Sequence, residues 1–333
     1  MSKVLVTGGS GFIGTNLIEF LCNTGHQVCN IDIAPPLCEN QLPHWKKCNI
    51  LDLNTLSQEF LDFSPDVIVH LAARTDTESS ILSDYDANIT GTKNIIEAAR
   101  KLQTLKRLII TSTQYVYKSA SFPFPASDTT FEPHTVYGQS KVLTEKLTRE
   151  SGLNCCWTII RPANIWGPWH LRYPKELWKV IGKGYYVHPS KKPVIRTYGY
   201  VKNVVYQIQQ IFSADEAFVN HKTFYVGDLP CDSFTWLNEI SIQLNQKNIL
   251  RVPAAFIGVP ALLGDLLKKF GIKSPIHSTR YKNMIEDYYA PTNATVSLFG
   301  ASHPNLSENV KETIDWISSY YSPIDKFWKS KIP

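Results

Sequence analysis

The sequence predicts an α/β fold built on a doubly wound parallel sheet, and two observations support this. Short apolar runs alternate with segments whose apolar residues recur at helical spacing, which is typical of strands joined by helices. The first run, residues 4–7, leads directly into a turn that contains Gly8, Gly11 and Gly14. Such a turn lets a diphosphate approach the N–H groups of the following helix. Taken alone, it could also be a glycine-rich turn that binds nothing.

Further strands and helices follow in order until the alternation breaks after Pro162. We expect strands at 27–31, 45–50, 66–70, 107–112 and 157–160, and helices at 86–102 and 136–149. Beyond them, aromatic residues and Gly/Lys/Pro-rich stretches predict a smaller irregular domain that closes over the edge of the sheet. The predicted domains are therefore 1–162 and 163–325, with the chain crossing back to the first lobe around 201–224.

Composition excludes several classes of protein. The 333 residues carry a net charge of +5 without a basic cluster, so we expect no nucleic-acid partner. Seven cysteines lack Cys-x-x-Cys spacing, which indicates free thiols, no metal site and a cytoplasmic protein. The uncharged stretch 252–264 is too short to span a bilayer. We expect it to be a buried loop and helix, with contact to a membrane surface as the alternative.

Asp32 ends the second predicted strand, about twenty residues after the glycine turn. A carboxylate at this position can accept hydrogen bonds from both ribose hydroxyls of an adenosine and would repel a 2′-phosphate. The next Lys or Arg in the sequence is Lys46. The pattern therefore predicts NAD rather than NADP, and a strand-end acid in a turn is the alternative.

The glycine spacing Gly-x-x-Gly-x-x-Gly, preceded by Thr7 and ending in Gly11-Phe12-Ile13-Gly14, resembles the short-chain dehydrogenase/reductase superfamily. Within it, the chain is similar to the extended branch, the NAD-dependent epimerase/dehydratase family, whose first domain has the Rossmann fold. The resemblance is also carried by His70-Leu71-Ala72-Ala73 and by Asn88-x-x-Gly91-Thr92. It implies a homodimer, and cofactor contacts at Gly8, Gly11, Phe12, Ile13, Gly14, Asp32, Asn49, Ile50, Leu71, Ala72, Ala73, Tyr137, Lys141 and Ala163. The family has an Asp where this chain has Asn49, but an amide oxygen can also accept from adenine. His70 is expected to be a packed strand residue and Asn88 a structural brace.

Tyr137 and Lys141 are four residues apart and therefore share one face of the predicted helix. A phenol has a pKa near 10, and an adjacent ammonium together with an oxidised nicotinamide would lower it. The resemblance implies that Tyr137 is the general base or acid, that Lys141 orients it, and that Thr113 binds the reacting oxygen. An ordinary surface pair and an ordinary strand-end hydroxyl are the alternatives.

The implied substrate is a nucleotide-activated sugar, contacted by Thr113, Gln114, Asn164 and Arg196. The usual Arg-Asp-Phe is here Arg196-Thr197-Tyr198, so the match at Arg196 is loose. We expect oxidation of a ring hydroxyl at C4, which would make the protein an epimerase or dehydrogenase, and the reverse step would make it a 4-keto-sugar reductase. A 4,6-dehydratase is disfavoured because Gln114-Tyr115 replaces its Asp-Glu pair. A 3-beta-hydroxysteroid-dehydrogenase-like enzyme and a non-catalytic NAD sensor remain as further alternatives. We expect no membrane partner.

Overall fold

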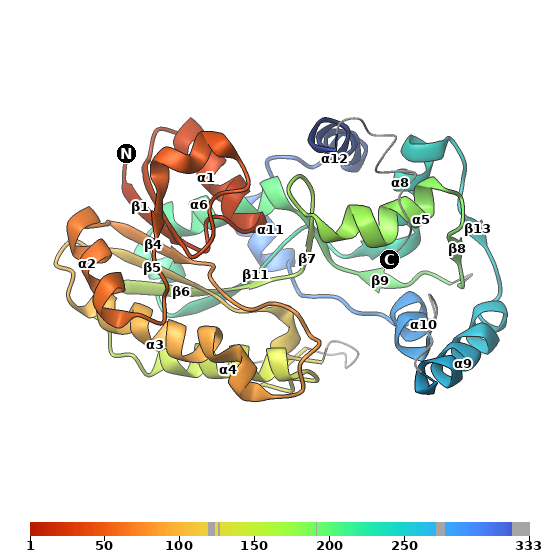
Figure 1. The fold of residues 1–333 in the computed structure, drawn as a ribbon, viewed down its shortest axis with the longest axis horizontal. Helices are drawn as coiled ribbons and strands as arrows, with labels where there is room; N and C mark the ends of the chain where they lie inside the picture. Colours follow the sequence, from red (N-terminus) through yellow and green to blue (C-terminus); the bar gives the residue numbers. More distant parts are fainter. Residues whose placement is uncertain (119–123, 126, 191, 271–276, 322–333) are drawn as a thin grey trace. The chain divides into compact units, whose positions relative to one another are not determined.

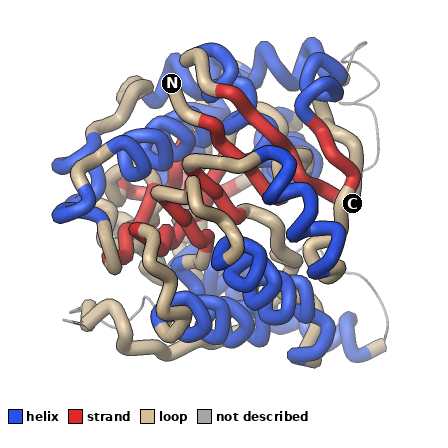
Figure 2. The backbone as a smooth tube through the Cα atoms, turned by 90° about the vertical axis from the view of Figure 1, so that its left-hand side faces the viewer, coloured by secondary structure: helices blue, strands red, loops and turns tan. Residues whose placement is uncertain are grey.

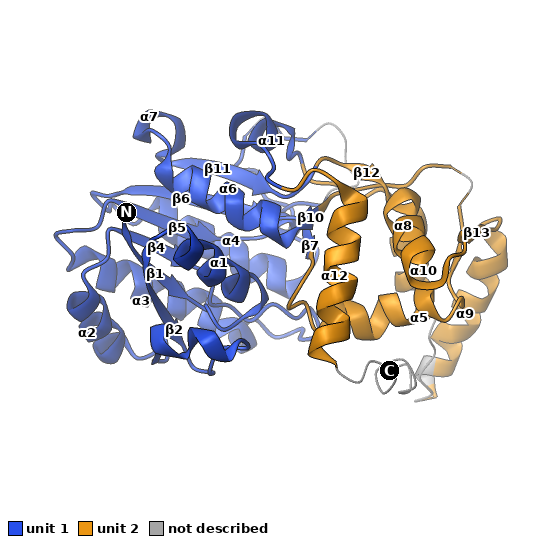
Figure 3. Cartoon of the chain, turned by 90° about the horizontal axis from the view of Figure 1, so that it is seen from above, with its two compact units in different colours: residues 1–165, 199–228, 291–302 blue, residues 166–198, 229–290, 303–333 orange. Residues whose placement is uncertain are grey.

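The structure is a computed structural model, and it describes residues 1–118, 124–125, 127–190, 192–270 and 277–321. The last residues of the predicted second domain, 322–325, lie outside these ranges. The chain divides into two compact units (Figure 3). Unit 1 contains residues 1–165, 199–228 and 291–302, and unit 2 contains residues 166–198, 229–290 and 303–333.

A seven-stranded parallel sheet forms the centre of unit 1, in the order β11-β6-β5-β4-β1-β2-β3. This confirms the predicted α/β class and parallel sheet. The strands are β1 (Lys3–Thr7), β2 (Gln27–Asp32), β3 (Trp45–Lys47), β4 (Val67–His70), β5 (Arg107–Thr111), β6 (Cys156–Pro162) and β11 (Lys222–Val226).

Helices cover both faces of this sheet (Figures 1 and 2). They are α1 (Phe12–Asn23), α2 (Leu53–Phe63), α3 (Asp86–Arg100), α4 (Val136–Arg149), α6 (Val201–Ser213), α7 (Glu216–Val219) and α11 (Asn293–Phe299). In β1, Val4 and Val6 pack in the core beneath α1 and α6, whereas Leu5 packs beneath α2 and α3. Because alternate strand residues point to opposite faces, a strand buried on both sides reads as a continuous apolar run.

The third strand is shorter than predicted, because it ends at Lys47 rather than at residue 50. The Leu51 amide donates to Asn49 Oδ1 at 3.0 Å and the Asp52 amide donates to the Asn49 carbonyl at 2.9 Å. Asp52 in turn caps α2 by accepting from the amides of Asn54 and Thr55. These side-chain bonds turn the chain out of the sheet.

Unit 2 is built around aromatic side chains. Trp236 stacks on Tyr198 at 4.2 Å between ring centroids and meets Trp166 edge-on at 5.5 Å. Its elements are a π turn (Pro174–Trp178), α5 (Lys179–Gly182), α8 (Ser233–Asn245), α9 (Ala255–Lys269), α10 (Ser278–Ile285), α12 (Leu306–Tyr320) and the two-residue strands β8 (Val187–His188), β9 (Ile195–Arg196), β12 (Cys231–Asp232) and β13 (Leu250–Arg251). The strands β7 (Asn164–Trp166) and β10 (Tyr198–Tyr200) lie where the chain passes between units.

The expectation that 252–264 is a buried loop and helix is wrong for most of its helical part. Helix α9 begins at Ala255, and along it Ile257 and Ala261 are buried while Phe256, Val259, Leu262 and Leu263 are exposed. Periodicity identifies an apolar face, but it does not show whether another element covers that face. Among the described residues, no helix is both long and apolar enough to cross a membrane.

Candidate active site

The glycine turn after β1 is held by close backbone packing at two of the three glycines of its Gly-x-x-Gly-x-x-Gly motif. Gly8 has a φ of +73°, and a methyl group there would lie 2.5 Å from the Ala72 amide nitrogen. A methyl group on Gly14 would collide with the Gly8 carbonyl oxygen and the backbone of Gly9. Both positions therefore require glycine for the turn itself.

Gly11 differs, because the fold does not require glycine there. Its φ of −79° suits any residue, and an added methyl group would meet only the Gly8 carbonyl oxygen, at 3.3 Å. Gly11 is the N-cap of α1, where no side chain caps the helix and the first turn holds no acidic residue. The open space beside a helix N-terminus fits the diphosphate of a dinucleotide.

Asp32 lies at the carboxyl end of β2, where the turn fixes its carboxylate. Oδ2 accepts from the Ser10 amide at 3.1 Å and Oδ1 accepts from the Ala34 amide at 3.0 Å. Strand β3 places Lys47 opposite Asp32 in register. In the sequence the nearest lysines are far from Asp32. In the sheet, however, Lys47 stands beside this acid.

The other predicted cofactor contacts in this half of the sheet have mixed surroundings. Asn49 is exposed and already accepts from the Leu51 amide, while Ile50 is buried in the core and lies against Gly91 of α3. The Leu71 amide donates to the Thr7 carbonyl, which holds the Leu71–Ala73 segment beside the glycine turn. The adenine-binding role of Asn49 and Ile50 stays a prediction.

His70 and Asn88 serve the packing around this segment. The His70 ring lies 2.7 Å from Thr7 Oγ1, and complete burial lowers its pKa to about 3. Asn88 accepts from the Arg74 amide at 2.8 Å, and donates to the Arg74 carbonyl at 3.0 Å and to Ser140 Oγ at 2.9 Å. Asn88 therefore ties the loop after β4 to α4.

Helix α4 brings Tyr137 and Lys141 to the end of β5. Thr135 caps the helix by accepting from the Gly138 amide at 2.9 Å. A methyl group on Gly138 would collide with the Tyr115 carbonyl oxygen. The helix thus approaches the short 3₁₀ turn Gln114–Val116 closely, and this turn follows Thr113.

Tyr137 and Thr113 interact directly in this arrangement. Burial raises the pKa of the Tyr137 phenol, whereas a hydrogen bond from the Thr113 side chain lowers it; the nearby phenols of Tyr115 and Tyr85 raise it further. The Tyr115 and Tyr85 rings lie 6.2 and 6.1 Å from the Tyr137 ring. Burial outweighs the lowering that the sequence predicts, so the pKa of the Tyr137 phenol lies above its usual value.

Lys141 is also buried, and its ammonium Nζ donates to the Thr111 carbonyl at 2.8 Å. Burial lowers the pKa of Lys141 to about 8, although the carboxylate of Glu145 acts in the opposite direction. The lysine therefore stays mostly protonated at neutral pH, close to the point at which it loses its charge.

The comparison with known proteins agrees with this geometry. Residues 4–227 match the model of the NAD dependent epimerase/dehydratase family. The chain belongs to this family. Its cofactor is NAD, in agreement with the prediction from Asp32 and with the fit of the glycine turn.

Two curated relatives and one solved structure illustrate the range of this epimerase/dehydratase family. Protein CapI of Staphylococcus aureus is 32% identical over 185 residues, 50% of this chain and 55% of its own. The N-acetyl-alpha-D-glucosaminyl-diphospho-ditrans,octacis-undecaprenol 4-epimerase of Escherichia coli O157:H7 is 26% identical over 84% of both chains. The UDP-glucuronic acid 4-epimerase of Bacillus cereus, solved with UDP-glucuronic acid and NAD, shares the fold with a TM-score of 0.69, 21% identity and coverage of 96% and 100%. The chain spans about half the length of the first curated relatives it matches.

A buried ion pair that the sequence analysis missed holds α4 against β6. Arg161 on β6 binds Glu145 on α4 through both carboxylate oxygens, each at 2.8 Å, and both side chains are almost fully buried. Glu145 Oε1 also accepts from Ser112 Oγ at 2.6 Å. Tyr137, Lys141 and Glu145 recur every four residues, so their shared helix face was the available signal.

Two of the predicted substrate contacts meet in unit 1. Gln114 Nε2 donates to Asn164 Oδ1 at 3.0 Å, and Gln114 Oε1 is buried without a hydrogen-bond partner. A buried amide oxygen without a partner suits a ligand that brings a hydroxyl group. The neighbouring Ala163 amide donates to the Val226 carbonyl at 3.0 Å.

Arg196 lies in unit 2, on β9, where its guanidinium Nη2 donates to the Glu286 carbonyl at 3.1 Å. It also lies 6.0 Å from the centre of the Tyr288 ring. Its role toward a substrate stays a prediction. Among the described residues, no three His, Cys, Asp or Glu side chains are gathered as a metal would need, and all seven cysteines are free.

Proposed function

We propose that this protein is an NAD-dependent enzyme that oxidises a ring hydroxyl, at C4, of a sugar carried on a diphosphate. The observation that carries the proposal is the buried cluster of Thr113, Tyr137 and Lys141 at the end of β5, beside the Gln114–Asn164 pair. Its parts match the needs of hydride transfer from an alcohol: a proton acceptor, a hydrogen-bond donor and a cation.

The proton is handled by Tyr137. Its phenolate takes the hydroxyl proton of the sugar, while Thr113 holds the reacting oxygen. Bound NAD would supply the hydride acceptor for the same carbon and a positive charge that stabilises the phenolate. Lys141 adds a second charge, held in place by the Thr111 carbonyl.

Gly11 and Asp32 hold the cofactor, the first by leaving space for the diphosphate and the second by accepting from the adenosine ribose. Gln114 Oε1 accepts from a sugar hydroxyl. Neither Gln114 nor Tyr115 is an acid that can remove water across C5 and C6, which supports epimerisation or simple oxidation over dehydration.

A nucleotide is our first candidate for the diphosphate carrier. A polyprenol is the second, and one observation favours it. The relative that aligns over 84% of both chains acts on a sugar linked through a diphosphate to undecaprenol. Both carriers present the same diphosphate, so both are consistent with a contact from Arg196.

The test is turnover by the NAD-loaded enzyme. UDP-, GDP-, CDP- and dTDP-sugars and a polyprenyl-diphosphate sugar are offered in turn, with products followed by NADH absorbance and by epimer separation. We expect one carrier class to react, and mass spectrometry of the denatured protein to show which ligand co-purifies. Turnover of apolar secondary alcohols alone would instead support the steroid-type alternative.

A second test concerns the cofactor. The Gly11→Ala variant should fold normally but bind NAD at least about tenfold more weakly, because its methyl group occupies the space assigned to the diphosphate. Calorimetric titration with NAD and a melting curve separate the two effects. Gly14→Ala is the matched control, and it should lower the melting temperature because its methyl group meets backbone. Wild-type affinity in a folded Gly11→Ala protein would contradict the assigned diphosphate position.

A further inference from the structure

Helix α9 exposes an unusual concentration of apolar side chains. Of the 21 large apolar residues that are exposed among the described ones, seven lie within positions 256–270. They are Phe256, Val259, Leu262, Leu263, Leu266, Leu267 and Phe270, with exposed fractions between 40% and 74%. Scattered exposed leucines are ordinary, whereas a continuous apolar patch marks a surface that binds something.

These seven side chains lie on one side of the helix. At about 100° per residue they occupy an arc of roughly 140°, with Leu262 near one edge and Leu267 near the other. A coiled-coil seam between two helices uses a narrower stripe of two positions in seven. The width of this face therefore favours a flat apolar surface over a single partner helix.

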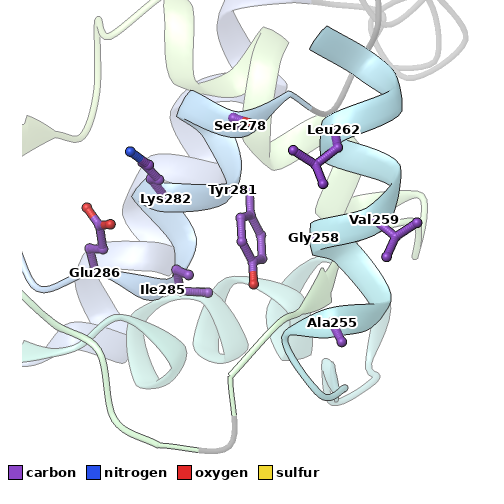
Figure 4. A pocket seen from close by; sticks show the side chains of 9 residues that line it. All are labelled: Ala255, Gly258, Val259, Leu262, Ser278, Tyr281, Lys282, Ile285 and Glu286. Atoms are coloured by element: carbon purple, nitrogen blue, oxygen red, sulfur yellow. The ribbon is translucent and has the colours of Figure 1, made fainter. Parts of the chain in front are cut away.

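The opposite side of α9 is buried within unit 2. Ile257, Ala261 and Gly264 are buried. Tyr281 of α10 lies beside Gly258, where an added methyl group would come within 3.2 Å of the phenol oxygen (Figure 4). Between the two helices lies a groove of about 390 Å³ with mostly apolar walls, which Val259 and Leu262 of the exposed face also line. The exposed face is thus presented by a packed helix pair.

Charge in this segment is strongly one-sided. Residues 255–282 contain five basic residues, Lys268, Lys269, Lys273, Arg280 and Lys282, against a single acidic one, Asp265. Asp265 accepts from the Ser278 amide at 3.1 Å, so its carboxylate caps α10. Arg280 and Lys282 are exposed on α10. An apolar face next to a helix that exposes Arg280 and Lys282 is complementary to a bilayer that carries anionic lipids.

We propose that α9 docks this protein on the surface of an anionic lipid bilayer. The seven apolar side chains enter the boundary between headgroups and acyl chains, and Arg280 and Lys282 of α10 face the lipid phosphates. The helix lies in the interface and does not cross the bilayer. This departs from the sequence-based expectation of no membrane partner, and it holds for either diphosphate carrier.

The experiment measures binding of the purified full chain to vesicles by co-sedimentation. Vesicles of phosphatidylcholine alone are compared with vesicles that contain 40% phosphatidylglycerol (about that fraction gives a strongly negative surface). The test variant is Leu262→Gln/Leu266→Gln. The matched control is Leu61→Gln/Leu298→Gln, which makes the same change at exposed leucines of α2 and α11.

We expect the wild type and the control to bind the anionic vesicles, and the α9 variant to bind at least about tenfold more weakly. Binding should weaken at high salt and on pure phosphatidylcholine. All three proteins should keep the same melting temperature. If the wild type stays in the supernatant with anionic vesicles, or if both double variants lose binding equally, the proposal is wrong. It is also wrong if the α9 variant only changes the oligomeric state in size-exclusion chromatography, since that would assign the face to a second copy.

Discussion

In most helices polar side chains are exposed and apolar ones are buried. Helices α4 and α9 depart from this distribution in two different ways. Helix α4 buries Tyr137, Lys141 and Glu145, each of which has a polar partner, whereas α9 exposes seven large apolar residues. Burying a polar group is costly unless it is bonded, and exposing apolar surface is costly unless something covers it. The first departure is resolved among the described residues, and for the second we propose an anionic lipid bilayer as the partner.

The largest expected effect comes from removing the oxygen of Tyr137. Tyr137→Phe keeps the ring and its packing, so NAD should still bind and the fold should remain. The value of kcat should fall by about 10²–10⁴-fold, which is what a positioned base typically contributes. Steady-state rates on the substrate found by the screen provide the measurement. A variant that turns over within threefold of the wild type would remove Tyr137 from the chemistry.

The next effect tests whether the polar interior of α4 is also structural. Arg161→Met leaves the Glu145 carboxylate buried without its bidentate partner, and it should cost about 3–5 kcal/mol of unfolding free energy. Urea denaturation measures the loss. The control is Arg172→Met, which breaks an exposed pair with Glu176 and should cost at most about 1 kcal/mol. Equal losses in the two variants would show that burial of the pair is unimportant.

The smallest effect has the opposite sign. The folded-state pKa of Lys141, about 8, lies below its unfolded value of 10.5. The unfolded chain therefore binds more protons between these two values, and the stability contributed by this group rises with pH across that window. Lys141→Met should stabilise the protein by about 1–2 kcal/mol at pH 7, after allowing for the lost bond to Thr111, and it should weaken NAD binding.

Melting temperatures at pH 7 and pH 9.5 check this prediction. The difference between Lys141→Met and the wild type should shrink at the higher pH, and taking that difference cancels the titration of the tyrosines and cysteines. A variant that is less stable than the wild type at pH 7 would mean that the Lys141–Thr111 bond outweighs the cost of burying the charge.

Much of unit 1 was predictable because its signals are local. The bounds of α4 were predicted as observed, from helical apolar spacing, and the Gly8–Gly14 turn follows from residues adjacent in sequence. The ion pair of Arg161 with Glu145 was not predictable, because it depends on which strand faces which helix. The exposed face of α9 was missed for a related reason: apolar residues at helical spacing look the same whether or not another element covers them.

The register of β2 and β3 has a further consequence for how this protein could change over evolution. Lys47 stands opposite Asp32, so the cation that a 2′-phosphate needs is already on the neighbouring strand. In the role proposed for Asp32, a single carboxylate repels the extra phosphate, and a lysine stands on the neighbouring strand. One substitution at position 32 would remove that repulsion and leave the lysine in place. On this proposal, we expect Asp32→Ala to narrow the preference for NAD over NADP, as measured by calorimetric titration with each cofactor.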